Sequence, residues 1–292
     1  MTQHDVRGVG IEVESYGPET APAFLLIRGL STQLIQWPDV FVGGLVEAGF
    51  RVVVFDNRDC GLSAKFDAAG TPSIQDLLSG NADVPYTLAD MARDTVGVLD
   101  ALEIEKAHVA GISLGGMVTQ HLAISHGERF HTATSIMSSS GAPGLPTATP
   151  EAMASLTARA DDPDDREKVI ELNMTGQRVI GSPGFPMSDE ELRSYCERAY
   201  DRCYCPGGSA RQMAAVLTDA TRADRLSEIS IPFQVLHGSE DPLIPLGCGE
   251  DTAKRVSGAV LHTIEGMGHD ITDANSPHVV ERLIAFAKAN GE

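Results

Sequence analysis

A serine flanked by small residues follows a short apolar stretch near the middle of the chain. The segment Gly111-Ile112-Ser113-Leu114-Gly115 comes after His108-Val109-Ala110, and apolar residues at helical spacing follow it. A Gly-x-Ser-x-Gly turn between a strand and a helix strains its serine and places helix N-terminal amides beside the hydroxyl. A pattern of five residues also occurs by chance, and the predicted strand before it and helix after it are what make it specific. Ser113 is therefore the candidate nucleophile.

A serine hydroxyl needs an adjacent base, and the sequence offers one histidine in a suitable place. His269 lies in a glycine-flanked turn that follows an apolar run at 259–264. His262 lies inside that run, and His121 lies on a predicted helix, so structural roles are expected for both. We therefore assign the role of the base to His269.

The base in turn needs an acid that holds its tautomer and stabilises the imidazolium. Asp241 follows an apolar run at 233–237, and the succeeding Pro242 favours an extended backbone that lets the aspartate side chain project from the loop. Glu240 is the competing carboxylate, and a turn residue that caps the next helix is the alternative interpretation of Asp241. Because parallel strands end at the same edge of a sheet, we expect Asp241, His269 and Ser113 to converge there.

Acyl transfer also needs hydrogen-bond donors where negative charge develops on the substrate oxygen, each contributing about 3 to 4 kcal/mol in comparable sites. The backbone amide of Leu114 directly follows the candidate nucleophile. A second amide, that of Leu30, lies after the apolar run ending at Ile27, where Gly29 permits close approach. Gly29 as an ordinary turn residue is the alternative.

The elements around these residues alternate between strands and helices, which predicts an α/β protein with a mostly parallel central sheet flanked by helices. Residues 9–16 alternate as an exposed antiparallel strand would, whereas 23–27 and 52–55 are continuously apolar, as strands covered on both faces are. Further strands are expected before Ser113 and at 132–137, 233–237 and 259–264, and helices at 37–48, 87–102, 249–256 and 278–289.

Residues 141–226 interrupt this rhythm. The segment opens with several prolines and glycines and contains helical patterns without apolar strand runs. We expect a core formed by residues 1–140 and 227–292, with 141–226 as a helical insertion. Substrate choice is expected to depend on that insertion, because the sheet does not constrain it.

Composition disfavours some classes of partner. The formal charge of −19 and the pI near 4.7 disfavour binding to nucleic acid or to an anionic membrane.

Five cysteines are an odd count, and Cys60 and Cys248 lie far from the other three, so a disulfide framework is not expected and the thiols should be reduced. Cys196, Cys203 and Cys205 lack the partner ligands of a metal site, and we expect no metal. The sequence begins without a signal peptide and contains no run of 18 apolar residues, which predicts a cytoplasmic protein. A homodimer is left open.

Several motifs give the chain a resemblance, over nearly its whole length, to the α/β-hydrolase superfamily and its ester-hydrolase and proline-iminopeptidase-like branch. Beside the serine turn stand Asp56-x-Arg58-x-x-Gly61-x-Ser63, His237-Gly238-x-x-Asp241 and Gly266-x-Gly268-His269. The resemblance implies that residues 141–226 form a cap domain and that no cofactor or metal is needed. Arg28-Gly29 stands where the family usually has His-Gly. Trp37-Pro38-Asp39, with Asp56-x-Arg58-Asp59, also resembles the methylesterases of anthracycline biosynthesis.

These residues predict a serine hydrolase that cleaves a small-molecule carboxylic ester. Ser113 attacks the carbonyl, His269 carries the proton, Asp241 orients His269, and the amides of Leu30 and Leu114 hold the oxyanion. Hydrolysis of amides, lactones or carbon–carbon bonds and cofactor-free perhydrolysis are alternatives on the same fold, because fold alone does not select among them. A ligand-binding module without turnover is the alternative from another class.

Overall fold

A single mixed sheet organises the part of the chain that the computed structural model describes, residues 2–73 and 84–291. Its strands there are β1 (Thr2–Val6), β2 (Val9–Tyr16), β3 (Ala23–Ile27), β4 (Arg51–Phe55), β5 (Ala107–Ile112), β6 (Phe130–Ile136), β7 (Phe233–Gly238) and β8 (Val260–Ile264). They lie in the order β1-β2-β4-β3-β5-β6-β7-β8. The pairs β1–β2 and β2–β4 are antiparallel, and all later pairs are parallel. The loops after β3, β5, β7 and β8 therefore leave the same edge.

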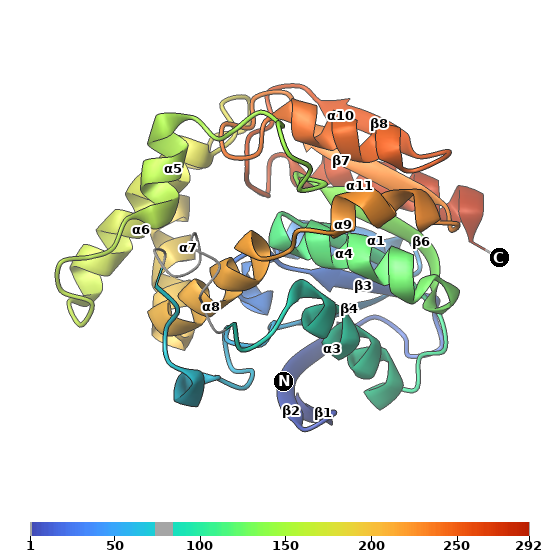
Figure 1. Cartoon of the computed structure of the whole chain (residues 1–292), viewed down its shortest axis with the longest axis horizontal. Helices are drawn as coiled ribbons and strands as arrows, with labels where there is room; N and C mark the ends of the chain where they lie inside the picture. The colour runs from blue at the N-terminus through green and yellow to red at the C-terminus, as the bar shows by residue number, and fades with distance from the viewer. Residues whose placement is uncertain (1, 74–83, 292) are drawn as a thin grey trace.

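Helices cover both faces of this sheet (Figure 1). On one face, α1 (Asp39–Glu47) and α11 (Ser276–Asn290) pack against each other. On the other face lie α3 (Leu88–Ala101), α4 (Leu114–Ser125) and α10 (Leu246–Arg255). Local signals set these boundaries: Thr87 and Asp90 form a reciprocal capping box at the start of α3, and Pro277 occupies the first turn of α11.

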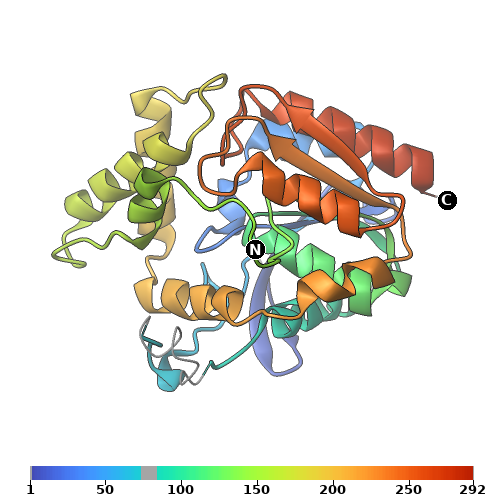
Figure 2. The same ribbon diagram turned by 45° about the horizontal axis from the view of Figure 1, so that its top comes forward.

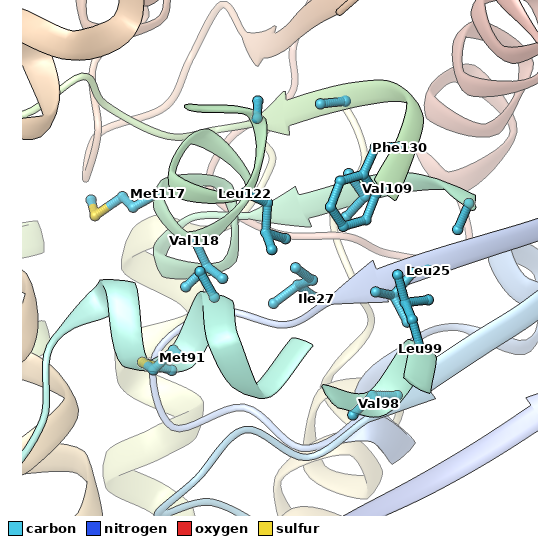
Figure 3. Packing of buried hydrophobic residues seen from close by; sticks show 14 of the residues in the cluster. Leu25, Ile27, Met91, Val98, Leu99, Val109, Met117, Val118, Leu122 and Phe130 are labelled. Carbon is cyan, nitrogen blue, oxygen red and sulfur yellow. The ribbon is translucent and has the colours of Figure 1, made fainter. Parts of the chain in front are cut away.

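The two faces hold separate apolar clusters because side chains along a strand alternate between faces. Leu25 and Ile27 of β3 pack on the side of α4, where they meet Val118 and Leu122 of that helix (Figure 3). Their neighbours Phe24 and Leu26 belong to the cluster beneath α1 and α11. The continuously apolar strand runs thus follow from burial on both sides, and the predicted α/β class with a mostly parallel sheet is confirmed.

Some predicted boundaries were wrong. Strand β1 was not predicted, the first helix spans Asp39–Glu47 rather than 37–48, and α10 begins at Leu246 rather than at residue 249. Strand β2 was expected to be exposed, but it lies between β1 and β4 and its centre is buried. Short 3-10 turns complete the described core at Leu34–Gln36, Asp67–Ala69, Gly127–Arg129 and Leu226–Glu228.

Between β6 and β7 the chain forms a run of helices. They are α5 (Pro150–Thr157), α6 (Arg166–Ile180), α7 (Asp189–Arg202), α8 (Pro206–Leu217) and the short α9 (Arg222–Arg225). Figures 1 and 2 show α5 to α8 at one side of the sheet, next to the loops that follow β3, β7 and β8. None of the described helices is both long enough and apolar enough to span a membrane.

Candidate active site

Ser113 occupies a strained turn between β5 and α4. Its φ of 54° and ψ of −119° lie in a region that a residue with a side chain rarely adopts. The Ser113 amide donates to the Ile136 carbonyl at 2.9 Å, which anchors the turn to β6. Gly115 is required here, because a Cβ at that position would lie 2.3 Å from the backbone oxygen of Ile27. This close approach of β3 and α4 leaves the half-buried Ser113 hydroxyl at the edge of the sheet.

His269 reaches Ser113 from the loop after β8. Its Nε2 lies 3.0 Å from Ser113 Oγ, and its Nδ1 lies 2.7 Å from Asp241 Oδ2. The His269 amide also donates to the Ile180 carbonyl at 2.7 Å, so α6 helps to fix this loop. The imidazole is 8% exposed and therefore lies mostly out of solvent.

Asp241 is held by its own loop. Its Oδ1 accepts the backbone amides of Leu243 at 2.9 Å and Ile244 at 2.8 Å, which leaves Oδ2 directed at His269. The turn-capping role and the role as partner of the histidine are thus both present in one carboxylate. Glu240, the competing carboxylate, is exposed, and its backbone amide pairs with the Met267 carbonyl.

His237 packs behind the Asp241 carboxylate. Its Nε2 lies 2.7 Å from the Ile244 carbonyl and 3.7 Å from Asp241 Oδ2. Burial lowers the pKa of His237, although the Ile244 carbonyl and the Asp241 charge oppose the shift. A neutral His237 donates its Nε2 proton to Ile244, so it buttresses the loop without competing for the Asp241 charge.

This hydrogen-bonded row can perform nucleophilic chemistry. When His269 Nδ1 is protonated and donates a hydrogen bond to Asp241, Nε2 is free to take the proton of the Ser113 hydroxyl. The row therefore has the geometry of a nucleophile, a base and an orienting acid, contributed by the loops after β5, β8 and β7.

The two predicted oxyanion donors belong to segments next to Ser113. A Cβ at Gly29 would come within 3.2 Å of Ser113 Cβ, so the loop after β3 runs directly against the serine. Leu30 and Leu114 line the same cavity as Ser113, and neither backbone amide has an acceptor among the described residues. The Ser31 amide donates to Gln212 Oε1 at 2.9 Å, which ties this loop to α8. The N–H groups of Leu30 and Leu114 thus belong to two segments that line the cavity with Ser113.

A cavity of about 400 Å³ opens above these groups. Its floor includes Ser113, His269 and Ile112 from the core. Its remaining wall is largely apolar and comes mainly from the inserted helices and their neighbours: Pro146, Met153, Leu156, Ile180, Met187, Met213 and Val216. A cavity of this size and character suits an apolar small molecule.

The structure adds residues to the cavity that the sequence did not identify as functional. Tyr195 of α7 and Asp270, next to His269, both line it, and so does Arg28. In the sequence, Arg28 stands out only because it occupies a position where the family that the chain resembles usually has histidine. Tyr195 could not be identified from the sequence, because no pattern in α7 indicates that Tyr195 lines the same cavity as Ser113.

One of the five cysteines, Cys248, lines this cavity, and burial raises the pKa of its thiol. All five cysteines are free thiols, and burial raises the pKa of Cys196 to about 11. Across residues 2–73 and 84–291, no group of three or more histidine, cysteine or acidic side chains is arranged to hold a metal ion.

Comparison with known proteins places this geometry in context. A family described as "alpha/beta hydrolase fold" matches residues 22–274. The chain is 27% identical to rhodomycin D methylesterase of Streptomyces peucetius, over 93% of this chain and 92% of that protein. It is also 27% identical to 3-oxoadipate enol-lactonase 1 of Acinetobacter baylyi, over 84% of this chain and 80% of that protein. The meta-cleavage product hydrolase of Pseudomonas fluorescens has a similar fold, with a TM-score of 0.76 at 17% identity over 99% and 98% of the two chains.

Proposed function

Because the chain belongs to the alpha/beta hydrolase fold family, we propose that it is a serine hydrolase that cleaves carboxylic esters through an acyl-enzyme. The observation that carries the proposal is the continuous row from Ser113 Oγ through His269 to Asp241, with contacts of 3.0 and 2.7 Å. A neutral hydroxyl is too weak a nucleophile without such a base.

In the first half of the reaction, Ser113 Oγ bonds to the ester carbonyl carbon while His269 Nε2 takes the hydroxyl proton. The carbonyl oxygen becomes an oxyanion that the Leu30 and Leu114 amides stabilise. The tetrahedral adduct then expels the alcohol, which receives the proton from His269. In the second half, water attacks the acyl group and His269 takes a proton from the water. The bond between the acyl carbon and Ser113 Oγ then breaks, the acid leaves, and His269 returns the proton to Ser113.

The substrate in this proposal is a small apolar molecule rather than a polymer. The cavity over Ser113 holds about 400 Å³, and its wall is mostly apolar. We assign residues 141–226 to a cap that selects the acyl and alcohol groups, because α5 to α8 supply much of that wall.

The names of two relatives favour an ester over the other bonds that this fold can hydrolyse. One is a methylesterase and the other an enol-lactonase, and a lactone is a cyclic ester. Both names fit an attack on an acyl carbon bonded to oxygen, the step that the Ser113 site can support.

The proposal is tested by hydrolysis of p-nitrophenyl butyrate and by labelling with a fluorophosphonate. Wild type should show both, and Ser113→Ala should show neither. Ser139→Ala is the matched control, because Ser139 lines the same cavity without contacting His269 among the described residues, and it should remain active and labelled. Labelling of Ser113→Ala at the wild-type rate would contradict the assignment.

A further inference from the structure

A buried guanidinium adjoins the proposed oxyanion site. Arg28 is 3% exposed, directly precedes Gly29, and lines the same cavity as Ser113. Its guanidinium carbon lies 4.8 Å from the centre of the Trp37 ring, and its Nη2 donates to the Tyr195 hydroxyl at 3.2 Å. Its Nε and Nη1 are also buried, and neither has a hydrogen-bond partner in the part of the chain that the structure describes.

Most other buried arginines in the described part of the chain have an acidic partner; Arg51, at 9% exposed, instead donates to Ser15 Oγ. Three of them each meet a carboxylate within 2.7 Å, in the pairs Arg58–Asp94, Arg211–Asp59 and Arg222–Asp219. Arg28 forms no ion pair with any described residue. A buried charge is costly unless it is paired. An arginine kept in this state beside the cavity therefore suggests that its counter-charge arrives from outside the chain.

Tyr195 extends the same arrangement toward the cavity. Its hydroxyl oxygen accepts from Arg28, and its own proton has no acceptor among the described residues. Burial raises the pKa of Tyr195, although the Arg28 charge opposes the shift, so the hydroxyl keeps its proton at neutral pH. Tyr195 is half-buried on α7 and lines the cavity with Arg28. Arg28 Nε, Arg28 Nη1 and the Tyr195 hydroxyl are therefore hydrogen-bond donors that have no acceptor among the described residues.

We propose that Arg28 and Tyr195 form a carboxylate-binding subsite, so that the preferred substrates are esters whose acyl group carries a carboxylate. The inference rests on the proposed ester hydrolysis by Ser113. A planar carboxylate matches the fork of a guanidinium, and the Tyr195 hydroxyl supplies a further donor. Arg28 lines the same cavity as Ser113 and Leu30, so one small substrate can carry both the carboxylate and the scissile ester. Half-esters of short dicarboxylic acids have this form.

Asp270 limits where this anion can lie. Its carboxylate also lines the cavity, and it accepts from the hydroxyl of Ser182 and from Asn275 Nδ2 at 3.5 Å. These contacts engage one edge of Asp270 and hold it against the loop that carries His269. An ionised Asp270 would repel a substrate carboxylate, whereas Arg28 attracts it, and burial raises the pKa of Asp270.

The test compares monomethyl glutarate, which carries a free carboxylate, with dimethyl glutarate, which does not. The measured quantity is the ratio of kcat/KM for the two esters at pH 7.5, which cancels any general loss of active enzyme. Wild type should favour the half-ester. Arg28→Gln should lower the ratio at least about thirtyfold, as removal of one partner of a buried charge pair does, and Tyr195→Phe should lower it less. Arg198→Gln is the control. It removes an exposed arginine from α7, the helix that carries Tyr195, and should leave the ratio of kcat/KM values unchanged.

A binding measurement separates this inference from the proposed function. Calorimetry on the wild-type protein and on Ser113→Ala should show that glutarate binds and that glutaramide does not. A wild type that hydrolyses both esters equally and fails to bind glutarate overturns the carboxylate subsite while ester hydrolysis stands, even if Arg28→Gln does not fold. Glutarate binding that needs Arg28, in a protein without Ser113-dependent hydrolysis, overturns the proposed function and supports the subsite.

Discussion

Arg211 and Asp59 form a two-point ion pair between α8 and the loop after β4. Arg211 Nε lies 2.8 Å from Asp59 Oδ2, and Nη2 lies 2.7 Å from Oδ1. The Asp59 carboxylate also accepts the Phe66 amide and the Tyr86 hydroxyl. Burial opposes ionisation, but these hydrogen bonds, with Arg211 first among them, lower the pKa of Asp59. The pair therefore fastens one end of the proposed cap to the core.

Arg211→Met should lower the free energy of unfolding by about 3 to 5 kcal/mol, because it leaves the buried Asp59 charge without its partner. Arg225→Met is the control, since its exposed pair with Glu228 is worth at most about 1 kcal/mol. Urea unfolding measures both. Adding Asp59→Asn to Arg211→Met should restore part of the loss. A stability for Arg211→Met within 1 kcal/mol of wild type would contradict the docking role.

The backbone strain at Ser113 predicts an inverted preference between glycine and alanine. Ser113→Gly should be more stable than Ser113→Ala by roughly 0.5 to 2 kcal/mol, because glycine relieves the strain but gains entropy on unfolding. At Ser125, the exposed last residue of α4, the order should reverse, since glycine is a poor helix former. Thermal unfolding of the four variants measures the difference. Equal melting temperatures for the two Ser113 variants would mean that the turn relaxes in solution.

Because His108 is buried, we expect the protein to lose stability on mild acidification. His108 is 3% exposed, lies near Phe24 and Phe50, and its Nδ1 lies 2.9 Å from Thr132 Oγ1. Burial lowers the pKa of His108 from its ordinary 6.5 to about 4, and the nearby His131 and Lys106 add to the shift. Below pH 6.5 the unfolded chain therefore binds a proton that the folded chain refuses until about pH 4.

The free energy of unfolding should consequently fall by up to about 1.4 kcal/mol per pH unit as the pH drops from 6.5 toward 4. His108→Gln should remove the contribution of His108 to this dependence of the free energy of unfolding on pH, even if the substitution also changes the stability itself. The exposed His278→Gln is the control and should retain the wild-type slope. Urea titrations between pH 6.5 and 5 measure it. An unchanged slope in His108→Gln would show that the imidazole is protonated inside the fold.

The sequence was sufficient to predict the class of fold and the convergence of three loops, because buried parallel strands have a clear apolar pattern. Ser113, Asp241 and His269 each follow such a strand. It was insufficient for β1, where Val6 is the only buried side chain of an edge strand and the rest is polar. It was also insufficient for Tyr195, because long-range contacts such as the Arg211–Asp59 pair, rather than any local pattern, fix the place of the inserted helices.

Asp241→Asn and Glu240→Gln should differ greatly in their effect on kcat. Asp241 Oδ1 accepts two backbone amides, from Leu243 and Ile244, so the oxygen of an asparagine must remain at that position. Its NH₂ group then takes the place of Oδ2, 2.7 Å from His269 Nδ1, where the carboxylate accepted a hydrogen bond. An amide at this position donates instead of accepting.

His269 must then carry its proton on Nε2, which can no longer take the proton of Ser113. The geometry is preserved while the base fails, and in serine proteases the equivalent change lowers kcat by about 10⁴. We expect a loss of that order for Asp241→Asn with little change in KM, since the interaction acts in the transition state. Glu240→Gln alters an exposed side chain one residue away and should cost less than about tenfold. Steady-state kinetics on p-nitrophenyl butyrate distinguish the two, and the opposite order of losses would assign the acid to Glu240.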